Sequence, residues 1–192
     1  FGDLQKALDL VDLAASAGAD VYKTQAFHTE TLVSDHLPEW RKRLKEKEVD
    51  YKFLRTVKDY CAKRQMIFMC TAHDEIALDW LRDLDVSAFK IGSGERGNIE
   101  FLKQHSQFDK PIILSTGMHS ETDVLRAIEV FAEQSVNQLA ILHCVTSYPV
   151  PNSELNLQTI TRLRNVFNGP VGYSDHSNSF DSAIAAVALG AT

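Results

Sequence analysis

Short apolar runs alternate with longer amphipathic segments along the whole chain. The apolar runs are continuous rather than alternating, which is typical of parallel strands covered by helices. We expect strands at 20–25, 66–71, 87–93, 111–116, 139–144 and 170–175. Apolar positions at helical spacing between these runs predict helices, most clearly over 3–18, 120–134 and 179–190.

Two predicted helices carry recognisable end signals. The segment 120–134 opens with Ser120-x-x-Asp123, a capping-box pattern that supplies acceptors for the first free amides of a helix. The last predicted helix ends at Gly190, a residue suited to the left-handed conformation that terminates many helices. We therefore expect the helices to begin and end close to these residues.

Strand–helix alternation predicts a parallel α/β fold, either an open doubly wound sheet or a barrel. In an open sheet the ligand gathers at one switch point, so only some strand ends should carry reactive side chains. Here every predicted strand ends in polar residues, and in a (β/α)8 TIM-type barrel all strand ends meet at one mouth. Such barrels typically need about 250 residues. We therefore expect one domain over 1–192, a barrel that is incomplete at both ends.

Composition limits the classes of function. The 192 residues are 44% hydrophobic and 24% charged, and the net charge of −6 argues against nucleic-acid binding. No apolar stretch reaches the length of a membrane span, and no signal peptide opens the chain. The mixed-charge run 39–50 is expected to be a solvated helix or loop. Cys61, Cys70 and Cys144 form no CxxC pair, so a cytoplasmic, reducing setting is expected.

The stretch AFKIGSGE, residues 88–95, places a lysine inside a buried strand and a carboxylate after it. A buried ammonium without a partner is costly, so Lys90 is expected to face an anion: Glu95, or a phosphate or carboxylate of a substrate.

The other strand ends supply more donors of the same kind. Lysines, hydroxyls and glycine-exposed amides on one rim suit an anion, most simply a phosphate. The predicted rim consists of Lys23, Gln25, Thr71, Lys90, Ser93, Glu95, Ser115, Thr116, His143, Tyr148, Ser174, Asp175 and His176.

The chain has seven histidines, a residue type that serves as a metal ligand or as a base. Five lie in loop or helix contexts with no partner at ligand spacing, which is typical of ordinary polar residues: His28, His36, His73, His105 and His119. His143, between apolar neighbours, is more typical of a hydrogen-bonded core histidine. His176 follows a strand and sits beside an acid, so it is a candidate metal ligand or base.

Five stretches together resemble the N-acetylneuraminate (sialic acid) synthase family in order and spacing, across nearly the whole chain. They are GDLQKALDLVDLAASAGADVYKTQAF, FKIGSGE, KPIILSTGM, LHCVTSYPVP and GYSDHS. The resemblance implies a (β/α)8 barrel, followed in the family by an antifreeze-protein-like domain that reaches a partner subunit. It also implies condensation of phosphoenolpyruvate with an N-acetylated hexosamine to a nine-carbon 2-keto acid, with a divalent ion, commonly Mn2+ (Mg2+ or Co2+ being alternatives).

The resemblance also implies that the protein is a homodimer. In addition, it implies roles for individual residues. Candidates for holding phosphoenolpyruvate are Lys23, Thr71, Lys90, Ser93, Ser115 and Ser174. Gln25, Glu95 and Tyr148 would contact the amino sugar, and His176 would be one of two metal histidines. Thr146 stands where some relatives have an asparagine that touches phosphoenolpyruvate. The first strand with its glutamate, the last strand with the second metal histidine, and the antifreeze-like domain have no counterpart in these residues.

Catalytic roles follow for Lys90, Glu95 and His176 in that chemistry. The aldehyde oxygen needs a Lewis acid, and a cationic C2 needs an anion such as Glu95 nearby. Two alternatives remain open: a class I aldolase that forms an imine on Lys90, and a sugar- or phosphate-binding barrel without turnover.

Overall fold

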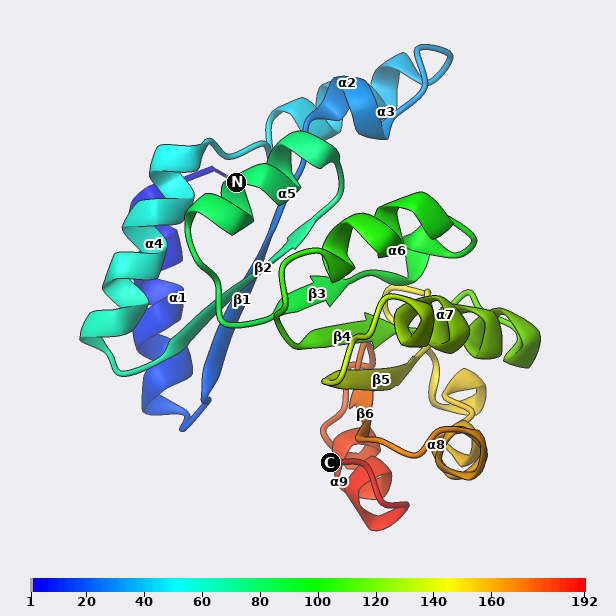
Figure 1. The fold of residues 1–192 in the computed structure, drawn as a ribbon. Coiled ribbons are helices and arrows are strands. Elements are labelled where there is room, and N and C mark those ends of the chain that lie inside the picture. Colours follow the sequence, from blue (N-terminus) through cyan, green and yellow to red (C-terminus); the bar gives the residue numbers. More distant parts are fainter. Residues whose placement is uncertain (1) are drawn as a thin grey trace. The chain divides into compact units, whose positions relative to one another are not determined.

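The structure is a computed structural model that describes residues 2–192. Within these residues it is an α/β fold with six strands, each followed by at least one helix (Figure 1). The chain divides into two compact units, one ending at Phe89 and one running from Lys90 to Thr192.

The first unit is built around two parallel strands. Its elements are α1 (Leu4–Ser16), β1 (Val21–Ala26), α2 (Thr29–Leu32), α3 (Pro38–Lys45), α4 (Tyr51–Lys63), β2 (Ile67–Ala72) and α5 (Glu75–Asp83). β1 and β2 pair in register from Val21 opposite Ile67 to Ala26 opposite Ala72. α1 and α4 pack against each other (Figure 1). Asp50 and Asp74 cap α4 and α5 by accepting hydrogen bonds from backbone amides, which explains where these helices begin.

The second unit contains three paired parallel strands and most of the helices that cover them. Its elements are β3 (Phe89–Ile91, which starts at the last residue of the first unit), η1 (Ser93–Glu95), α6 (Ile99–Ser106), β4 (Ile112–Ser115), α7 (Glu121–Glu133), β5 (Leu139–Cys144), η2 (Asn152–Glu154), α8 (Gln158–Val166), β6 (Val171–Ser174) and α9 (Asp181–Ala188). β4 pairs with β5, and β5 with β6.

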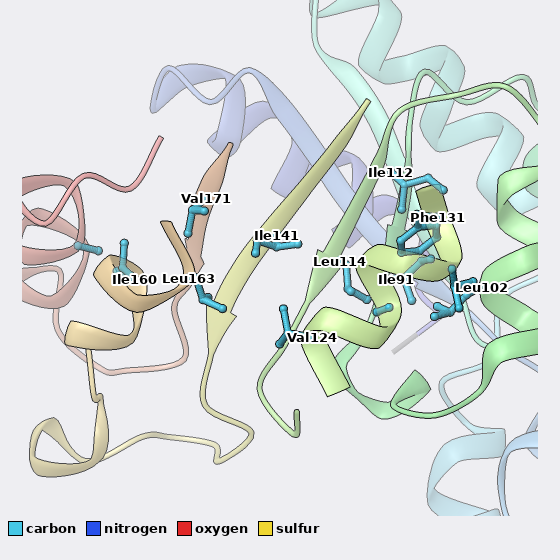
Figure 2. Close-up of a cluster of buried hydrophobic side chains, with 13 residues drawn as sticks. Ile91, Leu102, Ile112, Leu114, Val124, Phe131, Ile141, Ile160, Leu163 and Val171 are labelled. Carbon is cyan, nitrogen blue, oxygen red and sulfur yellow. The ribbon is translucent and has the colours of Figure 1, made fainter. Parts of the chain in front are cut away.

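The core of the second unit lies between one face of these strands and the helices. Figure 2 shows this cluster, in which strand and helix side chains interlock. The members from β4, β5 and β6 are alternate residues: Ile112, Leu114, Ile141 and Val171. Because successive side chains of a strand point to opposite faces, Ser115, Cys144 and Ser174 belong to the face away from the helices.

Most predicted elements are confirmed within one or two residues. Ser120 and Asp123 form the reciprocal capping box of α7. Gly190 has a φ of +93°, as expected for a left-handed helix end. β3 is shorter than predicted, because the chain turns into the short helix η1 at Ser93. The charged run forms much of α3, which buries no residue.

No helix in the part of the chain that the structure describes combines the length and the apolar character needed to cross a membrane.

Candidate functional site: a lysine–serine cluster and a held histidine

Lys90 is buried in the second unit and hydrogen-bonded. Its side chain leaves the strand on the face opposite that of Phe89 and Ile91, which are each 1% exposed. Lys90 itself is 7% exposed. Its Nζ donates to Ser115 Oγ at 2.6 Å and to the carbonyl of Ile91 at 2.8 Å. Both acceptors are neutral oxygens, and they orient the side chain.

The turn after β4 also contacts Ser93, the first residue of η1. The Gly117 N–H donates to Ser93 Oγ at 2.9 Å. Only glycine fits at 117, because a Cβ there would lie 2.7 Å from Thr146 Oγ1 and 2.9 Å from both Sγ and the carbonyl oxygen of Cys144. We call Lys90, Ser93, Ser115 and Gly117 the lysine–serine cluster. It offers an ammonium and two hydroxyls, donors that suit a phosphate or carboxylate, while the Gly117 amide holds the Ser93 hydroxyl in place.

His176 is held in one orientation by its neighbours. Its Nδ1 lies 2.9 Å from the carbonyl oxygen of Val145, and its own carbonyl accepts a hydrogen bond from Val150 N–H at 3.0 Å. The Tyr148 ring lies against the imidazole, with ring centroids 4.5 Å apart. Because a carbonyl only accepts, Nδ1 carries the proton and Nε2 keeps its lone pair. That tautomer suits a metal ligand or a base.

Asp175 fixes the loop that carries His176. Its carboxylate accepts hydrogen bonds from Tyr173 Oη (3.1 Å), Ser177 N–H (2.8 Å) and Ser182 Oγ (2.6 Å). Burial tends to raise the pKa of Asp175, but these hydrogen bonds outweigh it and hold the pKa below its usual value. Burial and the neighbouring carboxylate raise the pKa of Tyr173 to about 12. Asp175 therefore has a structural role here.

Two further predicted residues of the second unit stand at strand ends. Glu95 lies in η1, and its Oε2 accepts a hydrogen bond from Asn98 Nδ2 at 2.8 Å. Asn98 also caps α6, so Glu95 is tied to the start of that helix. Ser174 pairs in register with Cys144 on the face away from the helices.

The remaining predicted residues belong to the first unit. Lys23 and Gln25 are alternate residues of β1 and so share a face. Thr71 lies opposite Gln25 in the register with β2. Partial removal from water lowers the pKa of Lys23, with the neighbouring Cys70 acting in the opposite direction. The first unit therefore places an amide and a hydroxyl near the ends of β1 and β2, with the ammonium of Lys23 further back along β1.

Two residues of the predicted rim have other roles. His143 is 4% exposed, its Nε2 lies 2.7 Å from the Leu155 carbonyl oxygen, and its ring stacks on Tyr173. This confirms the interpretation as a core histidine and corrects its inclusion in the rim, because residue 143 belongs to the helix-covered face. Burial lowers the pKa of His143. The hydroxyl of Thr116 likewise donates a hydrogen bond to the backbone carbonyl of Leu142.

Sequence reasoning missed two features. The Gly117 amide was not among the predicted residues, although a glycine directly after a polar strand end is the signal that could have found it. The second is the pair of His28 and Asp74 in the first unit, whose Nδ1 and Oδ1 are 3.1 Å apart. His28 also lies edge-on to Trp80. Residues so far apart in sequence give no local signal of pairing.

Among the described residues, no three histidine, cysteine, aspartate or glutamate side chains are grouped so that they could hold a metal ion.

Known proteins resemble the chain over almost its whole length. N,N'-diacetyllegionaminic acid synthase of Campylobacter jejuni is 35% identical over 99% of this chain and 61% of its own length. Human N-acetylneuraminate-9-phosphate synthase is 29% identical over 99% of this chain and 56% of its own length. The crystal structure of the N-acetylneuraminic acid (sialic acid) synthetase from Leptospira borgpetersenii, in complex with citrate, is 33% identical. It superposes with a TM-score of 0.95 over 99% of this chain and 66% of that one.

The fold and the cluster define an α/β protein with parallel strands and a group of hydrogen-bond donors at its strand ends. The NeuB family pattern matches residues 10–192, and the chain belongs to the NeuB family. The chain spans little more than half the length of the two named relatives.

Proposed function

We propose that this protein condenses phosphoenolpyruvate with an N-acetylated amino sugar to a nine-carbon 2-keto acid of the sialic acid type, with release of phosphate. The observation that carries the proposal is Lys90, a buried ammonium that is oriented by hydrogen bonds to Ser115 and to the carbonyl of Ile91. The names of the relatives support the same class of reaction, because they are synthases of sialic acid-type sugars.

The lysine–serine cluster would bind the phosphate or carboxylate of phosphoenolpyruvate. Charge-assisted hydrogen bonds from an ammonium are roughly twice as strong as neutral ones. In this proposal Lys23, Thr71 and Ser174 add donors to the same substrate. Gln25, Glu95 and Tyr148 contact the amino sugar; Tyr148 is 70% exposed, which leaves its ring accessible to a ligand.

A divalent ion fits the chemistry of His176. The carbonyl of Val145 holds the proton on Nδ1, which leaves the Nε2 lone pair for a ligand bond, the arrangement that second-shell carbonyls commonly enforce. We propose that His176 is a ligand of Mn2+, or of Mg2+ or Co2+, together with ligands outside the described residues. When bound, such an ion polarises the aldehyde oxygen of an open-chain sugar.

The bond changes of the proposed reaction balance. The C3 methylene of phosphoenolpyruvate attacks the sugar aldehyde carbon, which forms the new C–C bond and leaves an alcohol and a cationic C2. The carboxylate of Glu95 would stabilise that cation. Water then adds to C2, and the C2–O bond to phosphate breaks to leave the ketone and inorganic phosphate.

An imine-forming aldolase on Lys90 is the competing function. The two hydrogen bonds from Nζ, to Ser115 and Ile91, can be donated by an ammonium or by the neutral amine that an imine requires. Borohydride reduction in the presence of a keto acid separates the two functions. Irreversible mass gain at Lys90 would establish the aldolase, and an unmodified Lys90 supports the synthase.

The direct test supplies phosphoenolpyruvate, Mn2+ and one of several N-acetylated hexosamines, and follows phosphate release and the mass of the product. The proposal expects phosphate and a nine-carbon keto acid in equal amounts, with at least one of N-acetylmannosamine, its 6-phosphate or a diacetylated relative. Phosphoenolpyruvate binding without phosphate release from any of these sugars would instead indicate a binding protein.

Assembly and location complete the proposal. We propose a homodimer acting in the cytoplasm, on the strength of the family resemblance and of three buried free cysteines. Sedimentation of the purified protein would reveal the oligomeric state.

A further inference from the structure

Within the second unit, a polar pocket adjoins the lysine–serine cluster. It has a volume of about 470 Å³ and is bounded by the turn 116–119, the end of β5 and the segment 156–162, which includes the start of α8. Neither Lys90 nor Ser93, Ser115 or Ser174 lines it. His143, which belongs to the helix-covered face, does line it. Gly117 of the lysine–serine cluster lines the pocket, but none of the side chains proposed to bind substrate does, so the pocket adjoins the cluster.

The lining of this pocket contains one guanidinium and no carboxylate. Its residues are Thr116, Gly117, His119, His143, Cys144, Val145, Asn156, Leu157, Gln158, Thr159 and Arg162. In a chain of net charge −6, a pocket with a guanidinium, two imidazoles and no acid is a local exception. Such a lining attracts anions and repels none.

Several of its donors have no partner in the protein. No hydrogen bond or ion pair joins the side chain of Gln158, Thr159 or Arg162 to any other residue of 2–192. An exposed arginine beside an acid would be a surface ion pair of little consequence. Here the guanidinium faces a hollow instead, with an amide and a hydroxyl from the same helix.

His119 adds a buried polar atom. Its Nδ1 is shielded from solvent and makes no hydrogen bond within residues 2–192. Burial lowers the pKa of His119, so the ring is mostly neutral near pH 7 and can present either a donor or an acceptor. A buried polar atom without a partner destabilises the protein unless a ligand or water satisfies it.

We propose that this pocket binds a phosphomonoester of a small hydroxylated molecule, with Arg162 contacting the phosphate and Asn156, Gln158 and Thr159 contacting hydroxyl groups. Arginine matches a phosphate through two parallel N–H donors. The volume lies within the range of pockets that enclose small ligands, about 300–1,000 Å³, which suits an ester better than a bare phosphate ion. The inference goes beyond the proposed function and does not depend on it.

The test measures binding of inorganic phosphate and of glucose 6-phosphate by isothermal titration. The protein carries Lys90→Met, a change that removes the ammonium of the other anion site and nearly preserves its volume. In this background glucose 6-phosphate should still bind, and more tightly than inorganic phosphate. Adding Arg162→Gln should weaken its binding by about tenfold or more, the loss expected for a charged hydrogen bond.

The matched control is Arg55→Gln on α4, an exposed arginine of the first unit that lines neither this pocket nor the cluster. It should leave both affinities unchanged. Equal affinities in the Arg162→Gln and Arg55→Gln proteins, or no binding in the Lys90→Met protein, would overturn the site. Binding of inorganic phosphate as tight as that of the ester would overturn the assignment of a phosphomonoester. The same titrations in the otherwise unmodified protein, where Arg162→Gln alone should remove one of two sites, decide the question if Lys90→Met does not fold.

Discussion

Lys90 sets the chemistry at the scale of single residues. An ammonium that is 7% exposed has lost most of its hydration, and the hydrogen bonds from its Nζ to Ser115 and Ile91 hold it in one orientation. In the proposed function this oriented charge contacts the phosphate or carboxylate of the substrate.

Replacing Lys90 should accordingly abolish binding of phosphoenolpyruvate while leaving the fold intact. We expect Lys90→Ala, and the better-matched Lys90→Met, to weaken binding by about tenfold to a hundredfold or more, because a charge-assisted contact is lost. Titration calorimetry measures the affinity, and circular dichroism checks the fold. Lys63→Met, at an exposed position of α4, is the control. Wild-type affinity in either Lys90 variant would exclude the anchoring role.

Glu95 should affect turnover rather than affinity. Glu95→Gln keeps the shape and an oxygen that can accept from Asn98, but removes the negative charge proposed to stabilise the cationic C2. We expect kcat to fall by about a hundredfold, the scale of losing one electrostatic group in an active site, with phosphoenolpyruvate affinity preserved. Steady-state kinetics and calorimetry separate the two quantities, and Glu100→Gln in α6 is the matched control. An unchanged kcat would make Glu95 only part of a turn.

At the scale of elements, the turn between β4 and α7 connects stability to the site. One end is fixed by the capping box of Ser120 and Asp123. The other end places Ser115 against Lys90 and the Gly117 amide against Ser93. A displacement of this short turn therefore changes both contacts.

Gly117→Ala tests that connection. The added methyl group would lie within 2.9 Å of the backbone oxygen of Cys144, which cannot rotate away as a side chain could. We expect the free energy of unfolding to fall by about 1–3 kcal/mol, the usual cost of overpacking, and phosphoenolpyruvate binding to weaken. Thermal unfolding and calorimetry measure the two effects. Gly94→Ala meets no atom within 4 Å and should leave the unfolding temperature almost unchanged. Equal stability in the two variants would contradict the crowding at 117.

The positions of the strands and helices could be predicted from the sequence, but the face of the strand on which each strand-end side chain lies could not. Strand positions follow from local apolar runs, and the capping box of α7 from two residues three apart, so both are local signals. Which strand-end side chain points toward the helices depends on the register and on where each strand stops. His143 and Thr116 were therefore wrongly grouped with Ser115 and Ser174. The pairing of His28 with Asp74 joins distant segments and left no pattern to detect.

At the scale of the whole molecule, membership in the NeuB family and a TM-score of 0.95 to a sialic acid synthetase support the predicted class of fold. The parallel strands with covering helices are confirmed within each unit. The closed eight-stranded barrel, like the single-domain boundary at 1–192, stays a prediction. Neither follows from the elements alone, because alternating strands and helices occur in open sheets as well as in barrels.

In the proposed function, the metal site rests on His176 and on ligands outside the described residues. A catalytic divalent ion needs several protein ligands and a position left open for substrate. The imidazole of His176 is held in one orientation by the Val145 carbonyl. The carboxylate of Asp175 already accepts hydrogen bonds from Tyr173, Ser177 and Ser182. One imidazole alone holds Mn2+ poorly. We therefore expect residues 1–192 by themselves to bind Mn2+ weakly and to form no product.

Electron paramagnetic resonance titration of Mn2+ measures this directly, in the 192-residue chain and in a chain extended to the length of the named relatives. The extended chain should bind Mn2+ tightly and turn over, because it can supply the missing ligands, and His176→Ala should abolish both. His36→Ala, which changes a histidine outside the lysine–serine cluster and the loop of His176, is the control and should abolish neither. Tight binding by the 192-residue chain would show that the ligands are already present within it. Full activity of the extended His176→Ala protein would remove His176 from the metal site.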